Sequence, residues 1–316
     1  MGLKRSFLER NGLPEHYLQQ ASIWFDPIIE TIFEHQNSAG KTIVVGINGC
    51  QGSGKTTLAD YLCIGLERKG LKSIAISIDD FYLTRNERKQ LANDVHPLFS
   101  TRGVPGTHDL TLAIDTLNHL AQKAGEVKVP KFNKAQDDRL PIDQWPQVEA
   151  PLDVIILEGW CVGITAEVEE SLLEPINELE ADRDPSGTWR NYINKQLVTN
   201  YPDLWKLLDR LIMLQAPSFS CVYNWRLEQE QKLAQKEKLK EGSAETKNKI
   251  MEEQEIRDFI QHYERLTRHS LKYLPKICQH LFQLTTKRQV TSYQAPSPLP
   301  GDPRYGVHKI SLAGEL

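Results

Sequence analysis

Residues 49–56 read Gly-Cys-Gln-Gly-Ser-Gly-Lys-Thr and follow directly on the apolar run 42–47. Glycines in such a loop let successive backbone N–H groups turn toward one anion, and a helix that begins near Lys55 would add its positive end to the same place. The apolar spacing over residues 58–70 predicts that helix. The pattern of strand, glycine-rich loop and helix predicts a binding site for a nucleoside triphosphate. The alternative is a glycine-rich turn that binds nothing.

The residues predicted to hold the nucleotide come from this loop and from the first turn of the helix after it. Lys55 would reach the β- and γ-phosphates, and Thr56 would offer its hydroxyl to Mg²⁺. Oriented amides in the loop could lower the pKa of the Cys50 thiol and make it sensitive to oxidation, and a reduced structural thiol is the alternative. The predicted nucleotide contacts are Gly49, Cys50, Gln51, Gly52, Ser53, Gly54, Lys55, Thr56 and Thr57.

The composition is that of an ordinary globular protein. Of 316 residues, 40% are hydrophobic and 25% are charged, and the formal net charge of −4 gives no basic field for nucleic acid. The five cysteines have no C-x-x-C spacing, so neither a zinc site nor a disulfide framework is indicated. The first twenty residues do not read as a secretory signal, and no run approaches 18 apolar residues. We expect a cytoplasmic protein that acts neither at a membrane nor on nucleic acid.

Apolar runs that alternate with helical segments predict an α/β fold. Parallel strands buried on both faces read as continuous apolar runs, and their alternation with helices favours a doubly wound sheet. Ligands of such sheets bind beyond the carboxyl ends of the strands. We therefore expect a P-loop NTPase fold with a parallel sheet of about five strands. The predicted strands cover residues 42–47, 73–78, 154–157, 211–214 and 280–284.

The chain also divides by composition. Residues 1–40 carry apolar side chains at near-helical spacing, which predicts an N-terminal helical extension ahead of a main α/β domain over 41–290. Within that domain, Gln, Lys and Glu dominate residues 226–257. This composition predicts a charged helical insertion with a bend at Gly242-Ser243, either a mobile lid over the nucleotide or a solvated hairpin. Residues 291–316 are rich in proline and glycine and predict a poorly ordered tail.

Two further predicted strands end in carboxylates. Asp79 and Asp80 follow the second strand, and Glu158 ends the run 154–157. A carboxylate that faces a phosphate loop can hold Mg²⁺ through water and can accept a proton from an attacking hydroxyl. The alternative for each acid is a helix cap or a turn. Because Asp79 and Asp80 are adjacent, we expect them to point in different directions and to have different roles.

Five short motifs are distributed over the rest of the chain. They are Ser-Ile-Asp-Asp-Phe-Tyr-Leu-Thr at 77–84, Gly-Thr-His-Asp-Leu at 106–110, Val-Pro-Lys-Phe at 129–132, Leu-Glu-Gly-Trp at 157–160 and Val-Tyr-Asn-Trp-Arg at 222–226. Together they resemble the plant-type D-glycerate 3-kinases, within the wider P-loop group of phosphoribulokinase, uridine kinase and pantothenate kinase. The resemblance implies that Asp79 is the base on the acceptor hydroxyl, that Glu158 is the strand acid of the metal site, and that Arg226 is the lid arginine that meets the transferred phosphoryl group.

A small anionic acceptor would need cations or hydrogen-bond donors near Asp79. The stretch between the second and third predicted strands supplies several, although each of them taken alone can equally be a surface charge. Asp109 precedes the helical run 110–124 and is equally well explained as its N-cap. The predicted acceptor-binding residues are Asp79, Tyr82, Arg102, His108, Lys131, Lys134 and Arg139, and the predicted magnesium ligands are Thr56, Asp79 and Glu158.

These features together predict an ATP-dependent kinase that uses Mg²⁺ and acts on a small hydroxylated, anionic metabolite. The γ-phosphoryl group would pass to a primary hydroxyl, and D-glycerate, which gives 3-phosphoglycerate, is the first candidate. The catalytic residues would be Lys55, Asp79, Glu158 and Arg226. One alternative is a kinase of the same group that acts on a nucleoside, a pantothenate-like alcohol or a sugar phosphate. The other is a nucleotide-dependent interaction protein without kinase activity.

Overall fold

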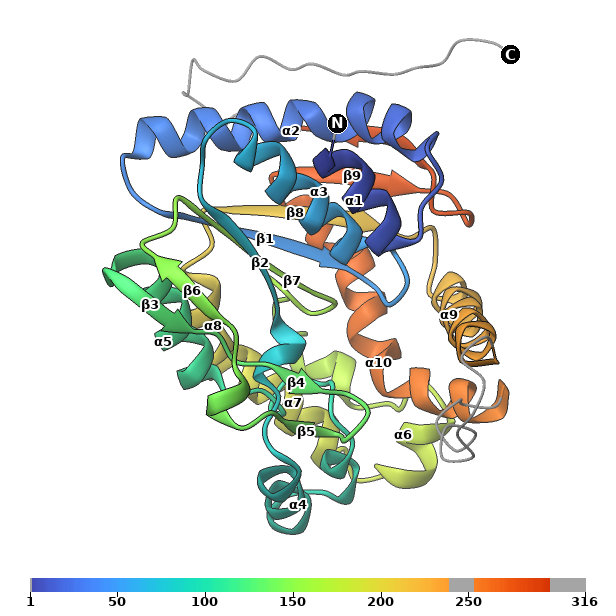
Figure 1. Ribbon diagram of the computed structural model, residues 1–316. Helices are drawn as coiled ribbons and strands as arrows, with labels where there is room; N and C mark the ends of the chain where they lie inside the picture. Colours follow the sequence, from blue (N-terminus) through green and yellow to red (C-terminus); the bar gives the residue numbers. More distant parts are fainter. Residues whose placement is uncertain (1, 239–252, 296–316) are drawn as a thin grey trace.

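The computed structural model describes residues 2–238 and 253–295. At its centre is a six-stranded sheet with the strand order β10-β9-β8-β1-β7-β2 (Figure 1). Five strands run parallel, and β10 pairs antiparallel with β9 at one edge. The strands of this sheet are β1 (Ile43–Gly49), β2 (Ser73–Ser77), β7 (Val154–Gly159), β8 (Arg210–Gln215), β9 (His280–Leu284) and β10 (Val290–Gln294).

The five predicted strands are confirmed, and the sixth, β10, corrects the prediction in two ways. It raises the strand count from five to six, and it occupies residues 290–294, most of which we assigned to a poorly ordered tail. Its sequence, Val-Thr-Ser-Tyr-Gln, lacks the continuous apolar run of a strand buried on both faces. An edge strand does not need such a run, which is why the pattern missed it. Residues 296–316 of the predicted tail lie outside the described residues.

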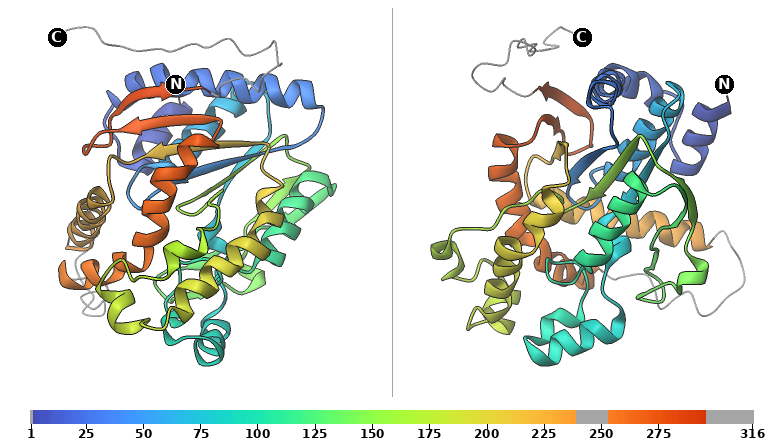
Figure 2. Two further views of the ribbon diagram at one scale, coloured as in Figure 1. Left: turned by 180° about the vertical axis from the view of Figure 1, so that it is seen from behind. Right: turned by 90° about the vertical axis from the view of Figure 1, so that its left-hand side faces the viewer.

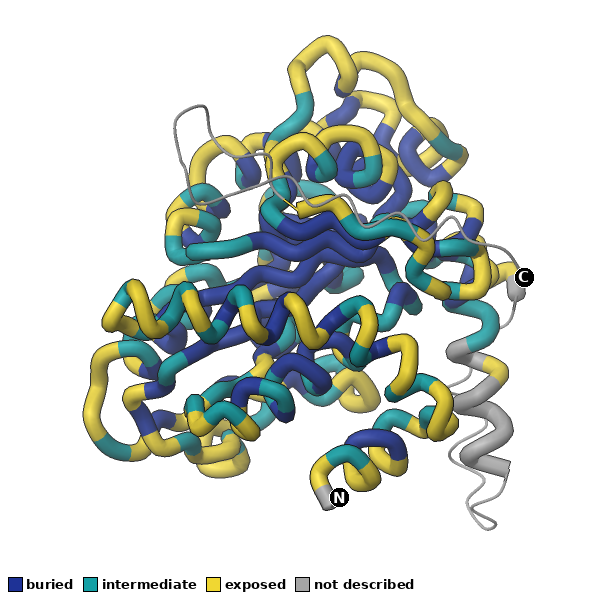
Figure 3. The backbone as a smooth tube through the Cα atoms, turned by 90° about the horizontal axis from the view of Figure 1, so that it is seen from above, coloured by how far each residue is buried: buried dark blue, intermediate teal, exposed yellow. Residues whose placement is uncertain are grey.

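The sheet separates two hydrophobic cores because successive side chains of a strand point to opposite faces. In β7, Val154 and Ile156 belong to one core, while Ile155 and Leu157 belong to the other. Figure 2 shows helices against both faces, and in Figure 3 the strands form the buried layer between them. One face carries α1 (Gly2–Asn11), α2 (Tyr17–Ala39) and α3 (Lys55–Glu67). The other face carries α5 (Leu110–Gln122), α7 (Thr188–Thr199), α8 (Tyr201–Trp205) and α10 (Glu253–Tyr273). Three helices are more peripheral, namely α4 (Arg85–Asp94), α6 (Glu178–Arg183) and α9 (Ser220–Lys238).

Two short hairpins lie between α5 and β7 in the chain, and the sequence patterns did not predict them. In one, β3 (Gly125–Lys128) pairs with β6 (Gln147–Ala150). In the other, β4 (Phe132–Asn133) pairs with β5 (Asp138–Arg139) and packs against the 3₁₀ turn η1 (Ile78–Phe81) that follows β2. The second hairpin thereby brings residues 131–139 to the end of β2.

The helical nature of the N-terminal extension is confirmed, and its two helices share the core of the sheet. The α2 helix continues through Pro27 and ends at Gly40, which has φ of 60° and donates its N–H to the carbonyl of Gln36. Phe25 of α2 packs edge-on against Phe282 of β9, with ring centres 5.2 Å apart. Residues 2–39 therefore complete one side of the fold.

The predicted charged insertion begins on α9 and ends on α10. These helices flank residues 239–252, and the predicted bend at Gly242-Ser243 lies outside the described residues. Among residues 2–238 and 253–295, no helix combines the length and the apolar character needed to cross a bilayer.

The packing of α2 makes a prediction about stability. Ile32 is 0% exposed in the core, whereas Ile23 of the same helix is 57% exposed. We expect Ile32→Ala to lower the free energy of unfolding by about 2–5 kcal/mol, because it leaves a cavity in a packed core, and Ile23→Ala to change it by less than about 0.5 kcal/mol. Urea unfolding of both variants measures the difference. Equal effects would contradict the packing of α2 against the sheet.

Candidate active site

The carboxyl ends of β1, β7 and β2 lie side by side because these strands are neighbours in the sheet. The phosphate loop follows β1, Glu158 lies near the end of β7, and Asp79 follows β2 in η1. In the strand register, Glu158 lies opposite Ile47 on one side and Ser77 on the other. The phosphate loop, Glu158 and Asp79 thus lie at one edge of the sheet.

The phosphate loop has the backbone conformation that an anion site needs. Gly52 and Gly54 have φ of 78° and 93°, in the left-handed region that favours glycine. The α3 helix begins at Lys55, so the free N–H groups of its first turn are available to phosphate oxygens. A Cβ atom at Gly52 would lie 2.7 Å from the Cβ of Trp225, so glycine there also permits α9 to touch the loop.

Cys50 does not have the reactive thiol that its position allowed. Burial raises the pKa of the Cys50 thiol to about 12, and the Lys55 ammonium offsets only part of that effect. A thiol with this pKa stays protonated at neutral pH, and only the thiolate is a good nucleophile. Burial and this raised pKa favour the reduced structural thiol at Cys50.

Glu158 is connected to the phosphate loop through two of its residues. The hydroxyl of Thr56 donates a hydrogen bond to Oε1 of Glu158 at 2.8 Å, and Nζ of Lys55 lies 3.9 Å from Oε2. Glu158 is only 5% exposed, and its Oε2 atom makes no hydrogen bond within the described part of the chain. A hydroxyl and a buried carboxylate oxygen beside a phosphate loop are the hard oxygen donors that Mg²⁺ takes together with phosphate and water. These residues fit the predicted metal.

Asp79 is surrounded by hydrogen-bond donors and positive charge. Its carboxylate accepts hydrogen bonds from the Tyr82 hydroxyl at 2.7 Å and from Nζ of Lys134 at 2.6 Å. Burial alone would raise the pKa of Asp79, but the ammonium groups of Lys134 and Lys55 and these hydrogen bonds hold that pKa well below its usual range. Asp79 therefore presents an ionised carboxylate at the strand ends.

Asp80 points elsewhere, as expected for an adjacent residue, and it anchors the β4–β5 hairpin. Its carboxylate accepts hydrogen bonds from Nζ of Lys131 at 2.8 Å and from the backbone N–H of Phe132 at 3.2 Å. Lys131, a predicted acceptor-binding residue, thus pairs with the structural acid rather than with Asp79. Neither acid caps η1, because the cap is Ser77, which accepts from the N–H of Asp79.

Two other predicted acceptor-binding cations also have carboxylate partners. Arg102 pairs with Asp137 and lies over the ring of Phe132, 5.5 Å from its centre. Arg139 donates to Asp109 at 2.9 Å. Asp109 in turn accepts from the N–H of Leu112, so it is the N-cap of α5, as its position suggested. The structure does not bring Arg139 to the Asp79 carboxylate.

His108 stacks on Tyr82 and is held as a neutral imidazole. The two ring centres are 4.7 Å apart, and Nδ1 of His108 lies 2.6 Å from the hydroxyl of Tyr201. That hydroxyl also accepts from the N–H of Gly106 at 3.0 Å. Burial lowers the pKa of His108 to about 4, and the negative charge of Asp79 offsets only part of this. Nε2 is buried without a hydrogen-bond partner in the described residues.

Arg226 belongs to the same electrostatic environment. Its guanidinium lies 5.7 Å from the ring centre of Phe259 on α10. One turn further along α10, the Tyr263 hydroxyl donates to the carbonyl of Arg102 at 3.1 Å. Burial raises the pKa of Tyr263, Asp79 raises it further, and the charges of Arg102 and Arg226 lower it. Asp79 and Arg226 therefore both act on one buried hydroxyl.

The sequence analysis missed Tyr201 and Tyr263. Each is a single aromatic residue in a helix, outside every motif, and such residues are ordinary core residues by pattern alone. Their contacts with His108 and Arg102 become visible only once the helices are packed.

A strand, a glycine-rich loop that leads into a helix, and a buried acid on the neighbouring strand define the P-loop class of nucleotide-binding proteins. The parallel sheet with helices on both faces is the predicted doubly wound fold. Residues 44–176 match the Phosphoribulokinase / Uridine kinase family. The chain belongs to this family, and it is a kinase.

Individual relatives agree with that assignment. A kinase of Schizosaccharomyces pombe that is named "Uncharacterized kinase mug58" is 32% identical over 261 residues, which are 78% of this chain and 87% of that protein. The chloroplastic D-glycerate 3-kinase of Arabidopsis thaliana is 36% identical over 237 residues, which are 70% of this chain and 46% of that protein. A solved D-glycerate 3-kinase of Cryptococcus neoformans aligns with a TM-score of 0.68 at 24% identity and covers 86% of this chain and 97% of its own. Membership in a kinase family removes the interaction protein without kinase activity from the alternatives.

The different environments of the two adjacent acids make a second prediction. We expect Asp80→Ala to lower the free energy of unfolding by about 1–3 kcal/mol, because it leaves the buried N–H of Phe132 without its partner. Asp115→Ala, at an exposed position of α5, is the matched control and should change that free energy by less than about 0.5 kcal/mol. Thermal and urea unfolding measure both. An Asp80→Ala variant as stable as the control would show that the acid does not anchor the hairpin.

Proposed function

We propose that this kinase transfers the γ-phosphoryl group of ATP to a primary hydroxyl of a small hydroxy acid, with D-glycerate as the first candidate. The observation that carries the proposal is the ionised Asp79 carboxylate, which lies at the strand ends beside the phosphate loop and bonds to Lys134. The names of the Arabidopsis and Cryptococcus relatives support glycerate as the acceptor. The five sequence motifs lie in the same region as these residues.

In the proposed reaction, the loop amides and Lys55 hold the phosphates. Thr56, Glu158 and, through water, Asp79 would hold Mg²⁺, which when bound neutralises charge on the phosphate oxygens. Asp79 receives the proton of the acceptor hydroxyl while the hydroxyl oxygen bonds to the γ-phosphorus. The bond from that phosphorus to the bridging oxygen breaks, and ADP leaves with the electron pair. Arg226 neutralises charge on the group in transfer.

The low pKa of Asp79 is compatible with this role. Phosphoryl transfer passes through a loose transition state in which the attacking oxygen gains little negative charge, so a weak base is sufficient. The hydrogen bonds from Tyr82 and Lys134 fix the carboxylate, and fixed geometry is the larger part of such catalysis. Asp79 would therefore act mainly by orienting the hydroxyl.

Recognition of the acceptor is proposed to come from groups around Asp79. Lys134 supplies the positive charge that the carboxylate of a hydroxy acid needs, and Arg102 lies close enough to Tyr263 to contribute to the same field. Nε2 of His108 has no hydrogen-bond partner in the described residues, and it would suit a polar group of the acceptor. The same cations also suit a phosphate, so a sugar phosphate is the alternative that these side chains allow.

The choice of acceptor can be tested directly. With Mg²⁺ and ATP, we expect ADP release with D-glycerate and none with the uncharged glycerol or uridine, because Lys134 offers its charge to an anionic acceptor. A panel with L-glycerate, glycerol, pantothenate, uridine and ribulose 5-phosphate, followed by a coupled ADP assay, measures the preference. Turnover with uridine or pantothenate but not with D-glycerate would contradict the proposed acceptor while leaving the kinase intact.

The role of Asp79 gives a separate prediction. Asp79→Asn should lower kcat by about 10²–10⁴-fold, the range for loss of a positioned base, because the amide cannot accept the proton. The affinity for ATP should stay nearly unchanged, since Lys55 and the loop amides are retained. Asp143→Asn, at an exposed position, is the control. Steady-state kinetics and nucleotide titration separate the two effects, and a variant with full kcat at saturating acceptor would rule out the assignment.

A further inference from the structure

A cavity of about 550 Å³ opens beside the phosphate loop. Residues 52–58 of the loop and of α3 form one wall. A second wall comes from the turn between β9 and β10, with Lys287, Arg288 and Gln289. The third wall comes from the end of α1, the α1–α2 connection and the start of α2, including Leu13, His16, Tyr17, Gln20 and Trp24. The volume lies within the range of about 300–1,000 Å³ that is usual for small-molecule sites.

The N-terminal wall is fixed to the helix that starts at the phosphate loop. Arg10 and Asn11, at the end of α1, donate hydrogen bonds to the carboxylate of Asp60 in α3, with Nε of Arg10 at 2.7 Å and Nδ2 of Asn11 at 2.6 Å. On α2, Asp26 accepts from the hydroxyl of Tyr61 at 2.6 Å. The segment between these anchors is therefore held over the first turns of α3.

The wall formed by the β9–β10 turn is also held in place. Arg288, with φ of 63°, pairs with Glu228 of α9 and lies 5.8 Å from the ring centre of Trp225. The indole N–H of Trp225 donates to the carbonyl of Thr286 at 2.7 Å. Trp225 of α9 thus contacts both the β9–β10 turn and Gly52 of the phosphate loop.

We propose that this cavity is the nucleoside subsite, in which the N-terminal segment 11–25 forms the wall against the base and ribose of the bound nucleoside triphosphate. The inference rests on the proposed use of ATP. Phosphates held by residues 52–57 would place the rest of the nucleotide beside the loop, and this cavity begins there. The wall opposite carries Tyr17 and Trp24, and aromatic rings of this kind stack on nucleobases.

The family match begins at residue 44, so the N-terminal wall lies outside it. The proposal assigns residues 11–25 a role in binding the nucleotide as well as in packing. It also explains why the N-terminal helices lie on the same face of the sheet as α3, whose first turn carries Lys55 and Thr56.

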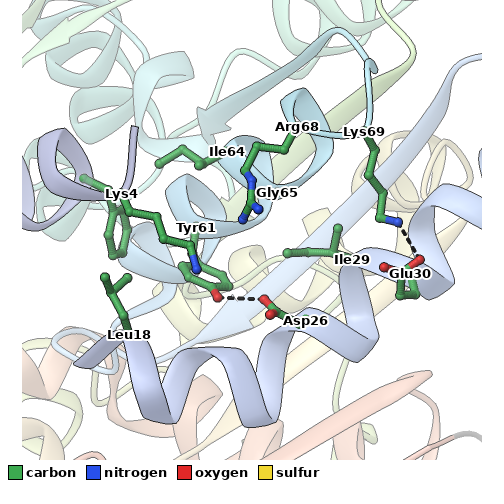
Figure 4. A pocket seen from close by; sticks show the side chains of 11 residues that line it. Lys4, Leu18, Asp26, Ile29, Glu30, Tyr61, Ile64, Gly65, Arg68 and Lys69 are labelled. Atoms are coloured by element: carbon green, nitrogen blue, oxygen red, sulfur yellow. Dashed lines mark hydrogen bonds and ion pairs between the residues drawn. The ribbon is translucent and has the colours of Figure 1, made fainter. Parts of the chain in front are cut away.

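A second cavity on the same helices serves as an internal comparison. It has a volume of about 320 Å³, lies between α1, α2 and α3, and is lined by Lys4, Ile29, Gly65 and Arg68 among others (Figure 4). No residue of the phosphate loop borders it. Its polar side chains pair with one another, as in the contact between Lys69 and Glu30 at 2.6 Å, which Figure 4 shows as a dashed line. A variant at Glu30 therefore changes α2 without changing the proposed subsite.

The experiment compares a nucleotide with its phosphate chain alone. Calorimetric titration measures the binding of Mg-ATP and of Mg-tripolyphosphate to the full chain and to three variants. We expect Trp24→Ala to weaken ATP by about tenfold or more, the loss of one stacking contact, and to leave tripolyphosphate within about twofold. The double variant His16→Ala/Gln20→Ala changes only exposed side chains and should weaken ATP at least about threefold, so the test does not depend on the folding of Trp24→Ala. Glu30→Ala should match the unmodified chain with both ligands.

Two results would overturn the proposal. One is ATP affinity within twofold of the unmodified chain in both cavity variants, and the other is an equal loss of ATP and tripolyphosphate affinity. If the variants weaken ATP selectively while no hydroxy acid is phosphorylated, the nucleoside subsite stands and the proposed acceptor falls. If the unmodified chain binds no ATP, the proposed function and the subsite fall together.

Discussion

The hydrogen bond from the Thr56 hydroxyl to the Glu158 carboxylate joins the first turn of α3 to the end of β7, and the rest of the site depends on it. A buried carboxylate is costly unless its charge is paired and hydrogen-bonded. Lys55 supplies the charge at 3.9 Å, and Thr56 supplies the hydrogen bond. Lys55 and Thr56 are the first residues of α3, so their contacts with Glu158 fix the phosphate loop and its helix against β7. The strand on the other side of β7 is β2, which leads to Asp79.

The adjacent acids show how one strand end can serve both chemistry and folding. Asp79 stays ionised because ammonium groups and the Tyr82 hydroxyl surround its carboxylate. The two carboxylate oxygens of Asp80 accept hydrogen bonds from Lys131 and from the backbone N–H of Phe132. The hairpin that Asp80 holds carries Lys134, which returns to Asp79. The contact of Asp80 with the hairpin thus places Lys134 at the carboxylate of Asp79.

Most of the fold followed from local patterns. The five apolar strands, the loop at residues 49–56 and the helices over residues 2–39 each carry a signal in their own short stretch of sequence. The edge strand β10 was missed because it needs no continuous apolar run, and the short antiparallel pairs were missed because strands of two to four residues carry no readable apolar pattern. In the site, the types of residue that converge on Asp79 were predictable, but their partners were not. Lys131, Arg102 and Arg139 carry the right charge and yet bond to Asp80, Asp137 and Asp109. These pairings depend on distances in the folded structure, which the sequence alone does not give.

The contact between Gly52 and Trp225 couples the phosphate loop to the helix that carries Arg226. Trp225 and Arg226 are consecutive residues of one helix, so they move together as that helix shifts. The Cβ and backbone of Trp225 lie against Gly52, so the position of α9 sets both the packing of the loop and the place of the Arg226 guanidinium. In the proposed function, a substitution that displaces α9 would therefore disturb phosphate binding and charge neutralisation together.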